Sequence, residues 1–228
     1  MTPPTSFPIA NGLCQAPLND PIWGHNRIMH GVTVAASGAP RSMRIDPRYV
    51  QQQHPANVIG HNGHTPADWF ANRFAALFHG AHGAPRAGVA GSIRDGAHSV
   101  VLAGAYRGLD IDQGNVIYYC ASGSIENRDP LRLANTPAIR HLRRSAATGQ
   151  PVRVLRSASG GGAHAPGVGI RYDGLYQVVR EGPVRFNARG GRYTRFEMRR
   201  MAGQTPLATI QAQSPTPQQV HDFGRIWI

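Results

Sequence analysis

Short segments with the composition of β-strands make up most of the second half of the chain, and they constrain the fold more than any other feature. Valine, isoleucine, leucine, tyrosine and phenylalanine recur in them, and glycine, aspartate or proline lies at their boundaries. Five such segments occur, at residues 98–104, 114–121, 151–157, 175–181 and 192–200. Short strands separated by turn residues are typical of a curled, mostly antiparallel sheet.

The strongest helix signal precedes these strands, at residues 65–80. Thr65 has the chemistry of an N-cap and Pro66 suits the first helical position. Apolar residues then recur from Trp69 to Leu77 at helical spacing, and Gly80 provides a stop. We therefore expect one long helix over this segment.

Two more helices complete the expected fold. Asp46 and Pro47 open a short helix over residues 46–53, and Thr136 caps a second helix over residues 137–147. Strands and segregated helices together predict an α+β fold, in which a crescent-shaped, barrel-like sheet carries two or three packed helices.

The length of 228 residues suits one sizeable domain with short appendages. Proline and polar residues mark residues 1–20 as an N-terminal arm. We expect the main domain to occupy residues 21–215, and a C-terminal tail with a short helix to occupy residues 216–228.

Positive charge in this chain comes from arginine alone. Its 24 basic residues include no lysine, and its net charge is +12. The absence of lysine excludes Schiff-base chemistry, a P-loop lysine and a nuclease site that needs lysine. No acidic residue lies between Asp129 and Asp173, and a second arginine cluster spans residues 185–200. This distribution suits a polyanionic partner, and the alternative is a basic surface that only confers solubility.

Other features narrow the setting of the protein. Two cysteines, Cys14 and Cys120, are too few for a disulfide framework, which favours a reducing, intracellular compartment. No apolar stretch is long enough to span a membrane, and the N-terminus lacks the pattern of a secretory signal. We therefore expect no membrane partner.

Four histidines form two pairs with the spacing of metal ligands, His61 with His64 and His79 with His82. An all-histidine set is unusual for structural zinc, so the favoured interpretation is ordinary loop or capping histidines. The two motifs of a zinc deaminase are absent from the sequence. We predict no metal, no cofactor and no catalytic residue.

Residues 103–120 predict a slot for a flat ligand. Tyr106 ends one strand, Tyr119 lies in the next, and a tight turn that contains Asp110 joins them. Two rings that face across a gap would hold a planar ring, and the carboxylate would accept a hydrogen bond from an exocyclic amino group. Cytosine and adenine carry such a group. The alternative is two core tyrosines beside a solvated turn.

A family resemblance favours the slot. Tyr172-Asp173-Gly174 directly precedes a strand, and residues 88–106 lie upstream in the expected order. Together with residues 79–91 and 133–157, they resemble the SET- and RING-associated domain, also called the YDG domain. The similarity covers roughly residues 65–202. That family is known for binding DNA that carries 5-methylcytosine and for flipping the base into a pocket of a crescent-shaped sheet.

The resemblance implies a role for individual residues. Tyr106 and Tyr119 would sandwich the base, and Asp110 would be the pocket aspartate. Cys120 stands where the family often has threonine, so it would serve the base only through its backbone N–H. The remaining implied assignments are room for the methyl group at Ala103 and Gly104, groove insertion by Val89, a reduced finger tip at Asn127 and Arg128, and a structural brace at Tyr172, Asp173 and Gly174.

The leading hypothesis is a non-enzymatic, nuclear reader of double-stranded DNA containing 5-methylcytosine, with a chromatin or histone-modifying protein as a possible partner. We expect phosphate contacts from Arg140, Arg143, Arg144 and Arg153. No SET, RING or histone-reading segment is expected in the remaining residues. Two alternatives stay open, a subunit of a modification-dependent nuclease and a non-selective basic nucleic-acid-binding protein.

Overall fold

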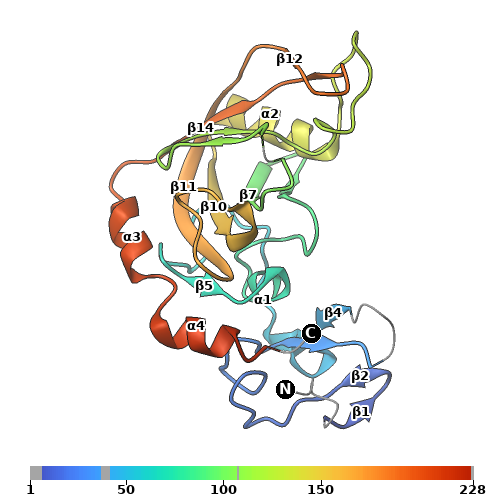
Figure 1. Cartoon of the computed structure of the whole chain (residues 1–228), viewed down its shortest axis with the longest axis vertical. Coiled ribbons are helices and arrows are strands. Elements are labelled where there is room, and N and C mark those ends of the chain that lie inside the picture. Colours follow the sequence, from blue (N-terminus) through green and yellow to red (C-terminus); the bar gives the residue numbers. More distant parts are fainter. Residues whose placement is uncertain (1–6, 37–41, 107, 227–228) are drawn as a thin grey trace.

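The computed structural model describes residues 7–36, 42–106 and 108–226. An eight-stranded sheet forms its centre (Figure 1), in the order β6-β7-β10-β11-β14-β9-β8, with β5 added beside β11. The strands are β5 (Trp69–Phe70), β6 (Val89–Ser92), β7 (Gly96–Leu102), β8 (Ile111–Asp112), β9 (Val116–Tyr119), β10 (Pro151–Ser157), β11 (Ile170–Glu181) and β14 (Phe196–Arg200). Each of the five predicted strand segments overlaps one of these strands.

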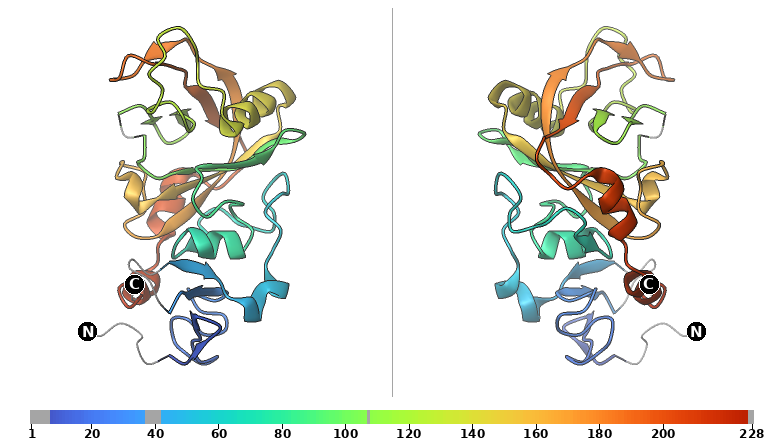
Figure 2. Two further views of the ribbon diagram at one scale, coloured as in Figure 1. Left: turned by 90° about the vertical axis from the view of Figure 1, so that its right-hand side faces the viewer. Right: turned by 90° about the vertical axis from the view of Figure 1, so that its left-hand side faces the viewer.

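The sheet is antiparallel except for the parallel pair β7 and β10. Register shifts interrupt β10 between Val154 and Leu155, and β11 between Val178 and Arg180. Such bulges bend a strand and increase its twist. The sheet is accordingly curled but not closed, as the side views show (Figure 2). The predicted α+β fold with a curled, mostly antiparallel sheet is therefore confirmed.

Helix α2 (Pro137–Thr148) covers one face of the sheet and begins and ends as its sequence predicts. The Thr136 side chain accepts a hydrogen bond from the N–H of Ile139, and Gly149 ends the helix in the left-handed conformation with φ of 69°. Ile139 and Leu142 are buried in an apolar cluster with Val152 and Phe196. Packing on β7 and β11 thus holds the helix in place.

The long helix predicted over residues 65–80 is wrong in its first half. Helix α1 spans only Arg73–Phe78, and the Asn72 side chain caps it by accepting from two backbone N–H groups. Trp69 and Phe70 form β5 instead, which pairs with the start of β11. The Trp69 indole also donates a 2.7 Å hydrogen bond to the carbonyl of Val168. These long-range contacts override the local helix signals.

The N-terminal part of the described chain packs below α1 (Figure 1). It contains β1 (Ile9–Ala10), β2 (Leu13–Cys14), β3 (Val32–Val34), β4 (Met43–Ile45) and the 3-10 helix η1 (Pro47–Gln52). Cys14 and Ala16 are buried in a second apolar cluster with Trp23, Met29 and Phe70. The described part of the expected arm is therefore packed against the rest of the molecule.

The remaining short elements include the 3-10 helix η2 (Ala158–Gly160), which directly follows β10. The two-stranded ribbon of β12 (Arg185–Phe186) and β13 (Arg192–Tyr193) projects at the end of the molecule far from the N-terminal part (Figure 1). Helices α3 (Leu207–Gln213) and α4 (Pro217–Phe223) run from the sheet back to the N-terminal part. Helix α4 lies where a short C-terminal helix is predicted. None of the helices within the described residues is both long and apolar enough to cross a membrane.

Candidate functional site

A small cavity, which we call the tyrosine cavity, lies beside the loop that follows β7. Its volume is about 180 Å³, which suits a single ring better than a larger ligand. Tyr119, the last residue of β9, is buried in its wall, and Tyr106 reaches it from the loop. Asp110, directly before β8, lines it as well. The lining residues are Arg73, Arg86, Ala87, Gly88, Val89, Val101, Ala103, Ala105, Tyr106, Asp110, Tyr119, Ser122 and Ala138.

Local hydrogen bonds fix the position of Asp110. Its backbone N–H donates to the carbonyl of Tyr106 at 2.9 Å, which closes the turn between them. Its Oδ1 accepts a 2.7 Å hydrogen bond from the N–H of Cys120. Burial raises the pKa of Asp110 to about 7, although the hydrogen bond from Cys120 and the charge of Arg195 act in the opposite direction. The carboxyl group therefore changes its protonation state near neutral pH.

Both tyrosines keep their protons at neutral pH. Burial raises the pKa of Tyr106 to about 12, and burial also raises the pKa of Tyr119. A neutral phenol ring offers an apolar face for stacking. Gly88 leaves the space that Tyr119 needs, since a Cβ atom at this position would lie 2.6 Å from the tyrosine hydroxyl oxygen.

Ala103 lies in the tyrosine cavity as expected, but Gly104 and Cys120 are not among its lining residues. Gly104 has φ of +72°, and a Cβ atom there would lie 2.4 Å from the carbonyl oxygen of Ser159. Close backbone packing thus accounts for this glycine. The Cys120 side chain is fully buried, and burial raises the pKa of its thiol to about 12. Cys120 contacts Asp110 through its N–H, and its thiol also interacts with the Asp110 carboxyl group.

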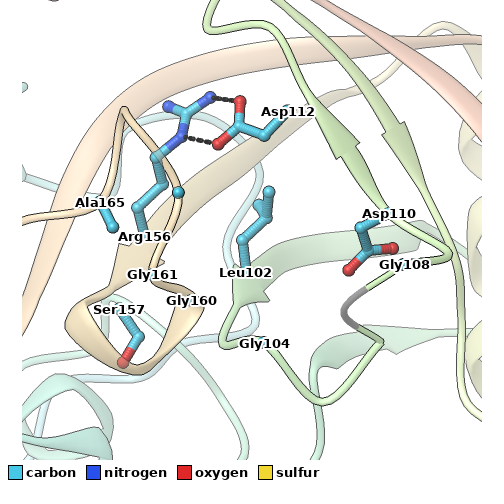
Figure 3. A pocket seen from close by; sticks show the side chains of 11 residues that line it. Leu102, Gly104, Gly108, Asp110, Asp112, Arg156, Ser157, Gly160, Gly161 and Ala165 are labelled. Carbon is cyan, nitrogen blue, oxygen red and sulfur yellow. Dashed lines mark hydrogen bonds and ion pairs between the residues drawn. The ribbon is translucent and has the colours of Figure 1, made fainter.

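A second cavity of about 290 Å³ shares Asp110 with the first (Figure 3). Leu102, Gly104 and the glycine-rich segment 160–162 line it, together with the ion pair of Asp112 and Arg156. Tyr106 and Tyr119 are not among its lining residues. The two cavities therefore differ in character, and the tyrosine cavity is the one of the two that tyrosine side chains line.

A buried charge network supports the turn that carries Asp110. Arg156, with 1% of its surface exposed, donates 2.7 Å hydrogen bonds to both Asp112 and Asp173. Arg171 donates to Asp173 as well, at 2.5 Å. The network joins β8, β10 and β11. The sequence alone does not indicate this partner of Asp112, because Arg156 lies 44 residues away in the chain.

The Tyr172-Asp173-Gly174 segment lies inside β11. The Tyr172 hydroxyl forms a 2.8 Å hydrogen bond with Nδ1 of His61, and Asp173 is fully buried in the charge network. Gly174 has φ of +106°, and a Cβ atom there would lie 2.4 Å from the Gln204 side-chain oxygen. The segment does not line the tyrosine cavity, and its contacts are those of a structural brace.

The prediction that Arg153 contacts phosphate is wrong. This arginine is fully buried, and its guanidinium donates to the carbonyl groups of Ala56, Val58, Gly60 and Ala81. Its role is to tie residues 56–60 to the sheet.

The three other candidate phosphate contacts lie on α2. Arg143 forms a two-point ion pair with Glu181, at 2.7 and 2.8 Å. Arg140 and Arg144 are both exposed, and Arg144 donates to the carbonyl of Arg94. Their phosphate contacts stay predictions.

Two of the three expected groove residues are also held within the protein. Val89 is 7% exposed, lies in β6 and packs in the apolar cluster under α2, so it does not project from a loop. The Asn127 side chain donates to the carbonyls of Arg132 and Arg192, and this folds its loop onto the β12–β13 ribbon. Val89 also lines the tyrosine cavity and Asn127 is partly exposed, so groove insertion by these two residues stays a prediction. Arg128 is exposed, and its contact with DNA stays a prediction.

Three of the four paired histidine side chains form hydrogen bonds with protein groups, and the His79 ring packs against Phe70 and Phe78. His61 contacts Tyr172, His64 contacts Asp68 and the carbonyl of His79, and His82 contacts Ser99 and the carbonyl of Ala87. Within the described residues, no cluster of three or more histidine, cysteine, aspartate or glutamate side chains is arranged to hold a metal ion.

Several cavity residues are absent from the sequence-based site, and two of them are charged, Arg73 and Arg86. Arg73 occupies the first position of α1, and Arg86 lies in the exposed segment before β6. The predicted long helix gave Arg73 no distinct position, and nothing in the sequence places α1 against the loop after β7.

Fold and cavity together define an α+β binding module with an aromatic slot for one ring. The family model of the SAD/SRA domain matches residues 58–204, and the chain belongs to this family. A UHRF1-like protein from Cryptococcus neoformans is 34% identical over 163 residues, which cover 64% of this chain and 47% of that protein. The E3 ubiquitin-protein ligase UHRF1 from Rattus norvegicus is 35% identical over 127 residues, which cover 46% of this chain and 16% of that protein.

Solved structures are similar over the same region. The modification-dependent TagI restriction endonuclease has a TM-score of 0.56 and 32% identity, covering 63% of this chain and 52% of that one. The SUVH5 SRA domain in complex with hemimethylated CG DNA has a TM-score of 0.54 and 25% identity, covering 66% of this chain and 98% of that one. The matched region spans about half of the Cryptococcus protein and a small part of the animal ligase.

Proposed function

We propose that this chain reads methylated double-stranded DNA by holding a flipped 5-methylcytosine in the tyrosine cavity, without chemistry on the base. The observation that carries the proposal is the convergence of Tyr106, Tyr119 and Asp110 on one ring-sized cavity. Membership of the SAD/SRA family supports it. So do the SUVH5 SRA structures, which contain methylated DNA.

The chemistry of the cavity favours cytosine over thymine. Cytosine carries an amino group at position 4, which can donate to the Asp110 carboxylate. Thymine carries an oxygen there, so it would set one acceptor against another. An unpaired buried polar group costs about 1–3 kcal/mol. The Asp110 carboxylate is therefore the group that selects the base.

Preference for the methyl group is expected to be modest. Burial of one methyl group contributes about 0.8 kcal/mol, and a closely fitting pocket about 1–3 kcal/mol. Ala103 and Val101 offer apolar contacts in the same cavity. The arginine-rich surface supplies most of the affinity through phosphate contacts, which weaken as salt rises.

Weak discrimination between hemimethylated and fully methylated sites belongs to the same proposal. Residues 122–135 form a loop whose Asn127 side chain is bonded within the protein. Such a loop has few groups left to detect a methyl group on the opposite strand. The SUVH5 SRA domain has been solved with both kinds of CG site.

We further place the protein in the nucleus, with a chromatin or histone-modifying protein as partner, because a reader of genomic methylation works where the DNA is. The names of the relatives support a chromatin setting only indirectly, since the matched region is 16% of the rat ligase. A fluorescent fusion followed by fractionation would test the location, and a fusion excluded from chromatin would contradict it.

Binding to matched duplexes tests the central proposal. The duplexes are unmethylated, hemimethylated and fully methylated at one CG step, and the proteins are the wild type and Asp110→Ala. We expect the wild type to bind both methylated duplexes several-fold more tightly, and the variant to lose that preference while keeping salt-sensitive binding. Equal wild-type affinity for all three duplexes would leave only a non-selective nucleic-acid-binding protein.

A second candidate function follows from the likeness to the TagI endonuclease, which acts on modified DNA by its name. A chain of this kind would deliver a cutting domain to methylated sites. Incubation of the protein with methylated plasmid and magnesium distinguishes the two. We expect no cleavage from this chain, and cleavage of methylated plasmid alone would favour the nuclease.

A further inference from the structure

Arg73 places a partly buried positive charge in the wall of the tyrosine cavity. It is the first residue of α1, next to the cap residue Asn72. Its Nη1 donates a 2.5 Å hydrogen bond to the carbonyl of Ala87. Burial lowers the pKa of Arg73, which means that the surroundings do not compensate for the lost hydration of its charge.

Within the described residues, which include all twelve acidic residues of the chain, no carboxylate forms an ion pair with Arg73. A guanidinium group has five N–H donors, and the described residues engage Arg73 through the single bond to Ala87. A partly buried charge that lacks a counter-ion is unfavourable. An anion at this position would therefore be bound strongly.

The geometry of a flipped nucleotide indicates which anion this is. In cytosine, the amino group at C4 and the sugar bond at N1 lie on opposite sides of the ring. A base whose amino group meets Asp110 therefore directs its sugar and phosphates away from Asp110, toward another part of the cavity wall. Arg73 and Arg86 both line the cavity, and Arg86 comes from the exposed segment before β6, so two cations are available to the phosphates.

We propose that Arg73 binds a backbone phosphate of the flipped nucleotide and so fixes the base in the tyrosine cavity. Arginine presents paired donors that match two phosphate oxygens. This inference rests on the proposed function, since it needs a flipped base. It adds a phosphate subsite that belongs to the cavity itself, separate from the general contacts of the arginine-rich surface.

The alternative is that Arg73 only braces the loop through Ala87. Neutral phosphates separate the two roles. We would prepare fully methylated duplexes that carry a methylphosphonate on the 5′ or the 3′ side of one 5-methylcytosine, and measure their affinity for the wild type and for Arg73→Gln. Arg44→Gln is the matched control, because it removes the same charge from an exposed position on β4.

We expect one of the two methylphosphonates to weaken wild-type binding about tenfold or more, as loss of a charge-assisted hydrogen bond does. Arg73→Gln should bind the unmodified methylated duplex that much more weakly, and the same methylphosphonate should cause it no further loss. Arg44→Gln should respond to the methylphosphonate like the wild type. The slope of log K against log salt should fall by about 0.9 in Arg73→Gln.

Failure of the proposed function and failure of the phosphate subsite give different results. Wild-type protein that does not prefer methylated duplexes contradicts the proposed function itself. If the wild type prefers methylated duplexes but Arg73→Gln loses as much affinity as the wild type on both methylphosphonates, only the phosphate subsite is overturned. Should Arg73→Gln not fold by circular dichroism, Arg73→Lys keeps the charge but loses the paired donors. The phosphate role then predicts a smaller loss on the same methylphosphonate than in the wild type, and a loss equal to that of the wild type overturns it.

Discussion

The carboxylate of Asp110 accepts a 2.7 Å hydrogen bond from the backbone N–H of Cys120, across the end of the β8–β9 hairpin. This bond orients the carboxyl group that lines both cavities. The Cys120 thiol also interacts with this carboxyl group. A substitution at position 120 other than proline removes the thiol contact and keeps the N–H contact.

Replacement of the Cys120 side chain should leave DNA binding nearly unchanged. In Cys120→Ala the N–H remains, so we expect affinity for a methylated duplex within about twofold of wild type, with a stability loss of about 1 kcal/mol from the lost buried sulfur. Fluorescence anisotropy and urea unfolding measure the two effects. A tenfold loss of affinity at normal stability would show that the thiol contacts the base.

The pH dependence of stability should reveal the buried state of Asp110. Its pKa rises from 3.8 to about 7 on folding, so the protonated form is favoured in the folded protein. The resulting stability is fully present below about pH 4 and is lost as pH rises toward 7. Asp110→Asn removes this dependence. Urea unfolding of both proteins at pH 5 and at pH 8 tests this expectation. The free energy of unfolding of the variant, relative to that of the wild type, should be larger at pH 8 than at pH 5. An unchanged difference would contradict the raised pKa of Asp110.

Removal of Arg156 should destabilise the fold strongly. Arg156→Met leaves Asp112 and Asp173 without their shared partner in a buried site, and a broken buried ion pair costs about 3–5 kcal/mol. Urea unfolding measures the loss. Arg94→Gln is the matched control, because the Arg94 side chain is 91% exposed and its ion pair with Asp95 should contribute no more than about 1 kcal/mol.

Substitutions of Arg153 and of Arg140 should have opposite effects on stability and on DNA binding. Arg153→Met removes the donor for four backbone carbonyl groups, so we expect a stability loss of about 3 kcal/mol or more. The exposed Arg140 should behave oppositely. Arg140→Gln should unfold like wild type, while its slope of log K against log salt falls by about 0.9. A normal slope in Arg140→Gln would remove it from the phosphate contacts.

The sequence predicts the strands well because their signals are local. Each β-rich run is bounded by its own turn residues, and Thr136 and Gly149 mark the ends of α2 in the same way. The start of α1 is different, because Trp69 and Phe70 are drawn into a strand by Ile170 and Arg171, a hundred residues away. Local propensity cannot register a partner at that distance.

The same holds for the site, where the sequence predicts local features but not those that depend on distant contacts. Tyr106, Asp110 and Tyr119 surround one turn, so their spacing indicates a common cavity. Burial is not visible in composition, and Arg153 therefore looks like a surface cation in a basic stretch. The sequence also does not predict that Arg73 lines the cavity, because this position depends on where α1 packs and not on the neighbours of Arg73 in the chain.

The sheet order has a consequence for the sequence of folding events. Strand β9, which carries Tyr119, joins the body of the sheet through β14, and Tyr119 is aligned with Phe196. The last strand of the sheet to be synthesised is thus the one that attaches the wall of the tyrosine cavity to β11. During translation, the cavity cannot assemble until the residues of β14 have left the ribosome. The site is therefore among the last parts of the domain to form, although most of its residues are made well before the end of the chain.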